Sequence, residues 1–234
     1  MLKAVLFDFN GVIVNDEALH EQLLEQLLIA ENLRPKRGEF RQVCLGRSDR
    51  ACIKELFELR GRVLTDKALD DLIGRKAAAY QQEIVNVEAV PSYPGLQDFL
   101  FNVRGANLKT AIVSGALRSE IELVLQRLEL QAAFSVIVSG DDIKTSKPEP
   151  DGYLLAVERL NAAFPGLNVT PGECLAIEDT FAGIEAAKRA HIPVVGVAHT
   201  YPFHMLQRRA NWTVDYLSDL EWERLRELYD RAIA

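Results

Sequence analysis

Short apolar runs separated by helical patterns are the feature of this sequence that most constrains its fold. Six runs are strand-like, and they cover residues 3–9, 109–115, 135–140, 174–179, 193–197 and 212–217. Helical patterns separate most of them, for instance at residues 119–130 and 151–164. Alternating strands and helices predict an α/β fold, a doubly wound parallel sheet with helices on both faces.

The longest gap between two strand-like runs separates the first run from the second. Residues from about 16 to about 87 carry no strand signal, and leucines recur at helical spacing in residues 16–32. Prolines and a glycine within residues 89–95 mark the return to the sheet. We therefore predict two domains, a core of residues 1–15 and 88–234 and an all-helical cap of residues 16–87. The two crossings between them would form a hinge.

Charge and hydropathy exclude two classes of partner. The 234 residues carry a formal net charge of −7 and no run of five basic residues, so a nucleic acid is not expected to bind. No stretch of 18 apolar residues occurs, so no membrane span is expected. The 48% hydrophobic content suffices for one sizeable core and a small appended domain. We expect a cytoplasmic monomer.

The three cysteines, Cys44, Cys52 and Cys174, are scattered and odd in number. No C-x-x-C pair occurs, so the sequence predicts neither a disulfide framework nor a zinc site. We expect all three to be small buried apolar residues.

Polar residues stand where several predicted strands end. They are Asp8 after the first strand, Ser114 and Gly115 after the second, Lys147 in a proline-flanked turn after the third, and Glu178 and Asp179 after the fourth. Because parallel strands present their carboxyl ends at one edge of a sheet, these side chains should converge.

Three carboxylates, a hydroxyl and an ammonium at one edge suit the binding of a phosphate ester. The carboxylates favour a hard, oxygen-seeking cation such as Mg²⁺. Lys147 can neutralise remaining negative charge, and an aspartate can attack phosphorus to form an aspartyl-phosphate. The alternative, that Asp8 is only a turn residue after a strand, is disfavoured because its partners occur together.

Four short motifs appear in a fixed order: "DFNGV", "VSG", "KPEP" and "ED". In this order the chain resembles the haloacid dehalogenase superfamily, in particular the subgroup with a helical cap that contains β-phosphoglucomutase and phosphoglycolate phosphatase. The resemblance implies that Asp8 is the nucleophile and that Ser114, Gly115 and Lys147 hold the phosphoryl group. It also implies a Mg²⁺ site formed by Asp8, the backbone carbonyl of Asn10, Glu178 and Asp179.

Asn10 departs from that pattern. In phosphatases and mutases of the superfamily this position is an aspartate that protonates the leaving oxygen and then deprotonates the attacking water or hydroxyl. An amide can do neither, and its presence removes a contribution of about 10²–10⁴-fold in rate. From the sequence alone, Asn10→Asp is therefore predicted to raise phosphatase activity, with His20 as the first candidate for a substitute proton donor.

The predicted cap holds further candidates for substrate contact. Gly46 and Arg47 lie in a loop, "LGRSDR", that resembles the superfamily's substrate-facing cap loop, and Arg47 and Arg50 could equally be solvated charges. His20 and Lys76 match positions in mutase-like caps. A packed or surface histidine and a lysine on an exposed helix face are the alternatives.

The sequence thus predicts a Mg²⁺-dependent phosphatase of a small phosphorylated metabolite. A sugar-phosphate mutase of the β-phosphoglucomutase type is an alternative with the same chemistry. Superfamily members that act on phosphonates use a cap lysine as a Schiff base, and Arg47 rather than a lysine follows Gly46, so only Lys54 and Lys76 leave this alternative open. A non-catalytic binder of a phosphorylated metabolite or of a protein is the alternative that Asn10 favours.

Overall fold

The computed structural model describes residues 1–231 and contains a six-stranded parallel sheet with the strand order β3-β2-β1-β4-β5-β6. The strands are β1 (Ala4–Phe7), β2 (Lys109–Val113), β3 (Val136–Val138), β4 (Cys174–Glu178), β5 (Val194–Val197) and β6 (Trp212–Val214). Each of the six predicted runs contains one of these strands, so the predicted α/β fold class is confirmed.

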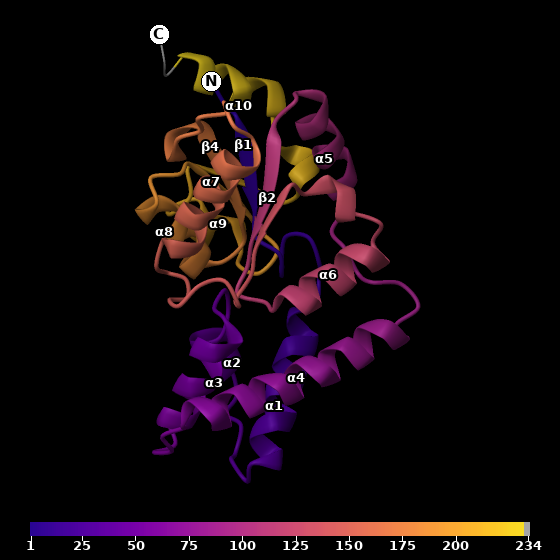
Figure 1. The fold of residues 1–234 in the computed structure, drawn as a ribbon, viewed down its shortest axis with the longest axis vertical. Helices are drawn as coiled ribbons and strands as arrows, with labels where there is room; N and C mark the ends of the chain where they lie inside the picture. Colours follow the sequence, from indigo (N-terminus) through magenta and orange to yellow (C-terminus); the bar gives the residue numbers. More distant parts are fainter. Residues whose placement is uncertain (232–234) are drawn as a thin grey trace.

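Helices cover both faces of the sheet (Figure 1). Val5 and Phe7 of β1 join the apolar cluster that holds α5 (Leu96–Gly105), α6 (Arg118–Arg127) and α10 (Trp222–Arg231). Ala4 and Leu6 point the other way, into the cluster of α7 (Asp151–Ala163), α8 (Phe181–Arg189) and α9 (Phe203–Leu206). The central strand is therefore buried on both faces, as its unbroken apolar sequence predicts.

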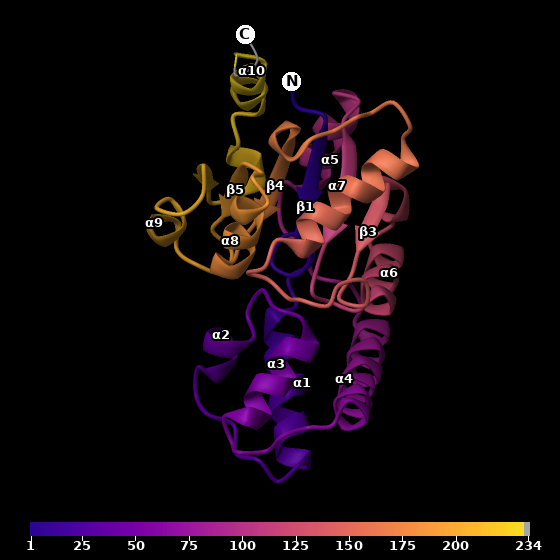
Figure 2. The same cartoon turned by 60° about the vertical axis from the view of Figure 1, so that its left-hand side comes forward.

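Four helices between β1 and α5 form a separate layer, here called the helical insertion (residues 17–86). They are α1 (Glu17–Ala30), α2 (Glu39–Val43), α3 (Asp49–Glu58) and α4 (Asp66–Asn86). Leucines of α1 and α4 pack with Ile53 and Phe57 of α3 in an apolar cluster of their own. Figures 1 and 2 show the insertion beyond the carboxyl ends of the strands, at the edge where the polar residues were predicted to meet.

The chain crosses between the sheet and the helical insertion twice, and the two crossings lie side by side. Val14 forms an antiparallel bridge with Ser92, and the Asn15 amide donates to the Pro91 carbonyl at 2.9 Å. A division into two domains at residues 16 and 87 stays a prediction. Within the described residues, no helix has the length and apolar character needed to span a membrane.

The expectation for two of the cysteines is wrong. Cys44 and Cys52 form a disulfide, with their Cα atoms 4.8 Å apart. Cys44 directly follows α2 and Cys52 lies in α3, so the turn between these helices brings the thiols together. Such a pairing has no signature in the spacing of cysteines along the chain. Cys174 is a buried free thiol in β4, as predicted.

Candidate active site

Asp8 directly follows the buried strand β1, and a lysine holds its carboxylate. Lys147 Nζ lies 2.8 Å from Asp8 Oδ1 and 2.6 Å from Glu178 Oε1, and all three side chains are buried. The Phe9 amide also donates to Asp8 Oδ1, at 2.7 Å. The Tyr153 hydroxyl donates to Glu178 Oε1 at 2.9 Å. Three residues predicted from separate motifs are thus in direct contact.

Asp179 completes a buried acidic cluster with Asp8 and Glu178. One carboxylate oxygen from each lies within 4.8 Å of the others. Asp179 Oδ2 accepts from the Thr200 hydroxyl, whereas its buried Oδ1 has no partner among residues 1–231. A buried carboxylate oxygen without a hydrogen-bond partner is energetically costly. Asp179 belongs to a cluster whose possible metal ligands are all carboxylate oxygens, the ligand type that hard cations prefer. The residues therefore fit a hard divalent cation.

The cluster carries more negative charge than Lys147 alone can offset. Burial and the Glu178 carboxylate raise the pKa of Asp8 from 3.8 to about 8, although Lys147 acts in the opposite direction. Burial and the carboxylates of Asp8 and Glu178 likewise raise the pKa of Asp179 well above its ordinary value. A cation in the cluster would stabilise the ionised carboxylates.

Gly11 lets the loop after β1 pass directly over this cluster. Its φ is +82°, and a Cβ at this position would lie 1.9 Å from Asp179 Oδ2. Both the backbone conformation and the close approach therefore require glycine. The sequence "FNGV" thus places the Asn10 backbone near the acidic cluster.

Ser114 and Gly115 follow β2 at the same edge. Ser114 is buried, and its Oγ accepts from the Ala116 amide at 3.0 Å. A Cβ on Gly115 would lie 2.8 Å from the backbone of Arg47 and Ser48, so the loop of the helical insertion packs onto this turn. A Cβ on Gly46, whose φ is +73°, would lie 2.4 Å from Thr180 Oγ1.

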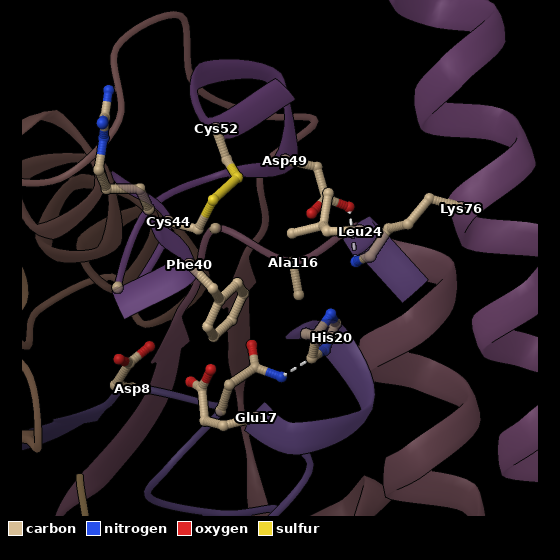
Figure 3. Close-up of a pocket in the computed structure, with 14 residues that line it drawn as sticks. Asp8, Glu17, His20, Leu24, Phe40, Cys44, Asp49, Cys52, Lys76 and Ala116 are labelled. Atoms are coloured by element: carbon tan, nitrogen blue, oxygen red, sulfur yellow. Dashed lines mark hydrogen bonds and ion pairs between the residues drawn. A yellow bond between two sulfur atoms is a disulfide. The ribbon is translucent and has the colours of Figure 1, made fainter. Parts of the chain in front are cut away.

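A pocket lies between the sheet edge and the helical insertion (Figure 3). The sheet contributes Asp8, Asn10, Gly115 and Ala116 to its lining. The insertion contributes Glu17, His20, Leu24, Phe40, Cys44, Gly46, Arg47, Asp49, Cys52 and Lys76. The structure thus brings the predicted residues His20, Gly46, Arg47 and Lys76 to the same pocket as Asp8.

The Asn10 side chain belongs to a partly buried network at the start of α1. Its Nδ2 donates to Asp16 Oδ1 at 2.9 Å and lies 3.1 Å from His20 Nε2. The Tyr80 hydroxyl donates to Asp16 Oδ2 at 2.5 Å, and the His20 ring stacks on the Tyr80 ring. Burial raises the pKa of Asp16, but His20, Asn10 and Tyr80 outweigh it and hold that pKa below its ordinary value. Asp16 therefore remains a carboxylate.

Lys76 is buried, so the expectation of an exposed helix face is wrong. Its Nζ lies 2.7 Å from Asp49 Oδ2 and 3.5 Å from Glu120 Oε1. The reason is that α4 packs along α6 of the sheet layer, which turns this face of α4 inward. Both acids are charge partners that no local pattern around Lys76 indicates.

The two arginines of the loop region take different positions. Arg47 lines the pocket, but its guanidinium contacts the Val43 carbonyl at 2.8 Å and Glu55 Oε2 at 2.6 Å. Arg50 pairs with Asp70 on the exposed surface of the insertion and does not line the pocket.

Sequence reasoning missed Glu17, which is the first residue of α1 and lines the pocket. A signal was present, because Glu17 and His20 are three residues apart and so share one face of a helix. Phe40 was also missed. It belongs to a five-residue helix whose short pattern carries no directional signal.

Comparison with known proteins decides the family. Residues 2–191 match the sequence model described as haloacid dehalogenase-like hydrolase. The chain belongs to this family. The phosphorylated carbohydrates phosphatase of Thermotoga maritima is 30% identical over 201 residues, which are 85% of this chain and 87% of that protein. The β-phosphoglucomutase of Bacillus subtilis is 28% identical over 235 residues, covering 96% and 97% of the two chains.

Solved structures show the same relationship for this haloacid dehalogenase-like hydrolase. The β-phosphoglucomutase of Clostridium difficile superimposes with a TM-score of 0.85 at 26% identity, over 100% of this chain and 99% of that one. The predicted resemblance to the β-phosphoglucomutase and phosphoglycolate phosphatase subgroup is confirmed, since relatives of both names match. The names of the mutase and of the phosphatase both describe enzymes that act on phosphorylated compounds.

Proposed function

We propose that this hydrolase is a Mg²⁺-dependent phosphatase of a small, hydroxylated monophosphate. The observation that supports this most is the contact of Lys147 with both Asp8 and Glu178, beside an acidic cluster whose Asp179 Oδ1 has no partner among the described residues. Asp8, Glu178 and Asp179, with the backbone carbonyl of Asn10, would hold the metal. Mg²⁺ bound there would supply the positive charge that allows a phosphate group to bind beside three carboxylates.

Asp8 is the proposed nucleophile. A carboxylate oxygen of Asp8 forms a bond to phosphorus while the ester P–O bond breaks, which gives an aspartyl-phosphate and a leaving alkoxide oxygen that takes up a proton to become the alcohol. Water then attacks phosphorus, the bond to Asp8 breaks, and phosphate leaves. Lys147 neutralises charge on the transferring group, and Ser114 with the backbone amide of Gly115 donates hydrogen bonds to its oxygens.

The helical insertion acts as a cap in this proposal. The Ser48 amide donates to Ser146 Oγ at 2.7 Å, which joins the loop of the insertion to the turn that carries Lys147. Gly46 packs on Thr180, next to Asp179. The described conformation is therefore closed over Asp8, and closure excludes water from the reacting groups.

The charges of the pocket favour a monophosphate over a bisphosphate. Lys76 is already paired with Asp49 and Glu120, and Arg47 with Glu55. Neither cation is available for a second phosphate without breaking an ion pair. Glu17 and the ring of Phe40 instead offer a polar side chain that can form hydrogen bonds and an apolar face, which suit the hydroxyls and carbons of a polyol or sugar.

A sugar-phosphate mutase is the second candidate, and the close overall likeness to β-phosphoglucomutases favours it. The third candidate is a non-catalytic binder, because Asn10 cannot transfer a proton. A panel of sugar and polyol monophosphates, sugar bisphosphates and phosphoglycolate, assayed with Mg²⁺, separates all three. A phosphatase releases inorganic phosphate, whereas a mutase isomerises a sugar phosphate without releasing it. A binder shows ligand-induced thermal stabilisation and neither reaction.

A further inference from the structure

Among the described residues, one carboxylate that lines the pocket, that of Glu17, has no hydrogen-bond or ion-pair partner. Asp8 is held by Lys147, Asp16 by Asn10 and Tyr80, and Asp49 by Lys76. The Glu17 side chain forms no hydrogen bond or ion pair among residues 1–231, although it lines the same pocket. Figure 3 shows its side chain turned into the pocket, toward the side on which Asp8 lies.

We propose that Glu17 is the proton-transfer group of this enzyme. It takes the role of general acid and base that the amide side chain of Asn10 cannot fill. This inference rests on the proposed phosphatase function. As Asp8 attacks phosphorus, the Glu17 carboxylic acid gives its proton to the ester oxygen that leaves. The Glu17 carboxylate then takes a proton from the attacking water as the bond between phosphorus and Asp8 breaks. The acid form of Glu17 is thereby restored, and one proton cycles per turnover.

The electrostatic surroundings of Glu17 suit both halves of that cycle. Burial raises the pKa of Glu17 to about 7, with Asp16 and Glu21 adding to the rise and His20 and Lys76 opposing it. Glu17 also interacts electrostatically with the acidic residue Asp179 and with Tyr80, Tyr93 and Tyr201, whose own pKa values it helps to raise. A group with a pKa near the working pH is an effective donor and acceptor in turn.

Asn10 takes a structural role in this arrangement. Its amide donates to both oxygens of Asp16, the residue directly before Glu17. Asn10 thus fixes the first turn of α1, from which the Glu17 side chain enters the pocket. His20 is the competing donor, but its Nε2 faces Asn10 at 3.1 Å and Asp16 at 3.3 Å, and its ring stacks on Tyr80. The Glu17 carboxylate has no such partner among the described residues.

The test compares Glu17→Gln with Glu21→Gln, which removes a carboxylate one turn further along α1 and outside the pocket lining. Two probes are used, p-nitrophenyl phosphate, whose leaving group needs little protonation, and glucose 6-phosphate, whose leaving alkoxide needs a proton. We expect Glu17→Gln to lower kcat for glucose 6-phosphate by about 10²–10⁴-fold. With p-nitrophenyl phosphate it should release one rapid equivalent of nitrophenol and accumulate phosphorylated Asp8, visible by intact mass after an acid quench.

The remaining outcomes separate this inference from the proposed function. Glu17→Gln with wild-type kcat on both probes, or an equal loss in Glu21→Gln, would overturn the role of Glu17 while the phosphatase function stands. Partial activity in Glu17→Asp, which keeps the carboxylate, supports proton transfer, whereas a Glu17→Asp as inactive as Glu17→Gln contradicts it. If the wild-type protein turns over neither probe nor any member of the phosphate panel, the phosphatase function itself fails.

Discussion

The Asn10 amide donates to both carboxylate oxygens of Asp16, at 2.9 and 3.1 Å, across the crossing that joins the sheet to the helical insertion. The amide is a hydrogen-bond donor, and it therefore stabilises the negative charge of the Asp16 carboxylate. An aspartate at position 10 would face a second buried carboxylate instead of donating to it. This relationship changes what is expected of a substitution at position 10.

Asn10→Asp should destabilise the protein at neutral pH. It removes a hydrogen-bond donor from buried Asp16 and adds a like charge, at a cost of about 1–3 kcal/mol in the free energy of unfolding. Urea denaturation of the single variant measures this loss. In the double variant Asn10→Asp, Asp16→Asn the donor and acceptor are exchanged, so stability should return. A single variant as stable as the wild type would mean that Asp16 does not depend on Asn10.

Asn10→Asp, combined with Asp16→Asn to keep the hydrogen bond between these positions, should restore activity to Glu17→Gln. The sequence alone predicts a gain in kcat of about 10²-fold or more when Asn10 becomes Asp. With Glu17 present in the pocket, we expect little gain in the wild-type background. We expect the full gain in the background of Glu17→Gln, because an acid at position 10 then supplies the missing proton. Steady-state kinetics of the four proteins in this cycle provide the measurement. Equal gains in both backgrounds would show that the two carboxylates act independently.

Mg²⁺ should stabilise the folded protein through the acidic cluster. At a free concentration of about 100 times its dissociation constant, the gain in unfolding free energy is about 2.7 kcal/mol. Asp179→Ala should abolish the rise in melting temperature, whereas Asp98→Ala on the exposed face of α5 should leave it unchanged. Equal Mg²⁺ affinity of the wild type and Asp179→Ala in calorimetric titration would contradict the assignment of this ligand.

Without a metal, stability should fall as pH rises from about 4 to about 8. The pKa of Asp8 is raised in the folded state from 3.8 to about 8, so in this range the folded protein binds more protons than the unfolded chain. Stability from this group is complete below the unfolded pKa and is lost as pH rises through the folded one. Mg²⁺ competes with these protons, so its stabilising effect should grow over the same range. Melting curves with Mg²⁺ and with a chelator, taken across that range, test both slopes.

Reduction of the Cys44–Cys52 disulfide should destabilise the helical insertion. The bridge spans eight residues and borders the pocket (Figure 3). Closure of so short a loop contributes about 2–3 kcal/mol in the chain-entropy account. Alkylation of the denatured protein should label one cysteine before reduction and three after it. Cys44→Ala should melt at the same lower temperature with or without reductant, and labelling of three cysteines before reduction would contradict the bridge.

Sequence patterns were sufficient to place the candidate residues at one edge of the sheet. Asp8, Ser114 and Asp179 each directly follow a mostly apolar strand, and parallel strands have only one edge at which their carboxyl ends meet. Lys147 was identified from its motif, and its contact with Asp8 follows from the same edge. These placements depend on local periodicity and on strand direction, and both can be predicted from the order of residues in the sequence.

The rest was decided only by tertiary packing. Glu17 becomes a pocket residue because the two crossings lie side by side and set α1 over Asp8. Lys76 is buried because α4 packs along α6, and Cys44 meets Cys52 because a turn folds α2 onto α3. The sequence by itself determined the strands, the sheet and the residues at its edge, since these depend on near neighbours. Which side chains of the helical insertion meet that edge depended on contacts between residues far apart in the chain, and only the folded structure decided them.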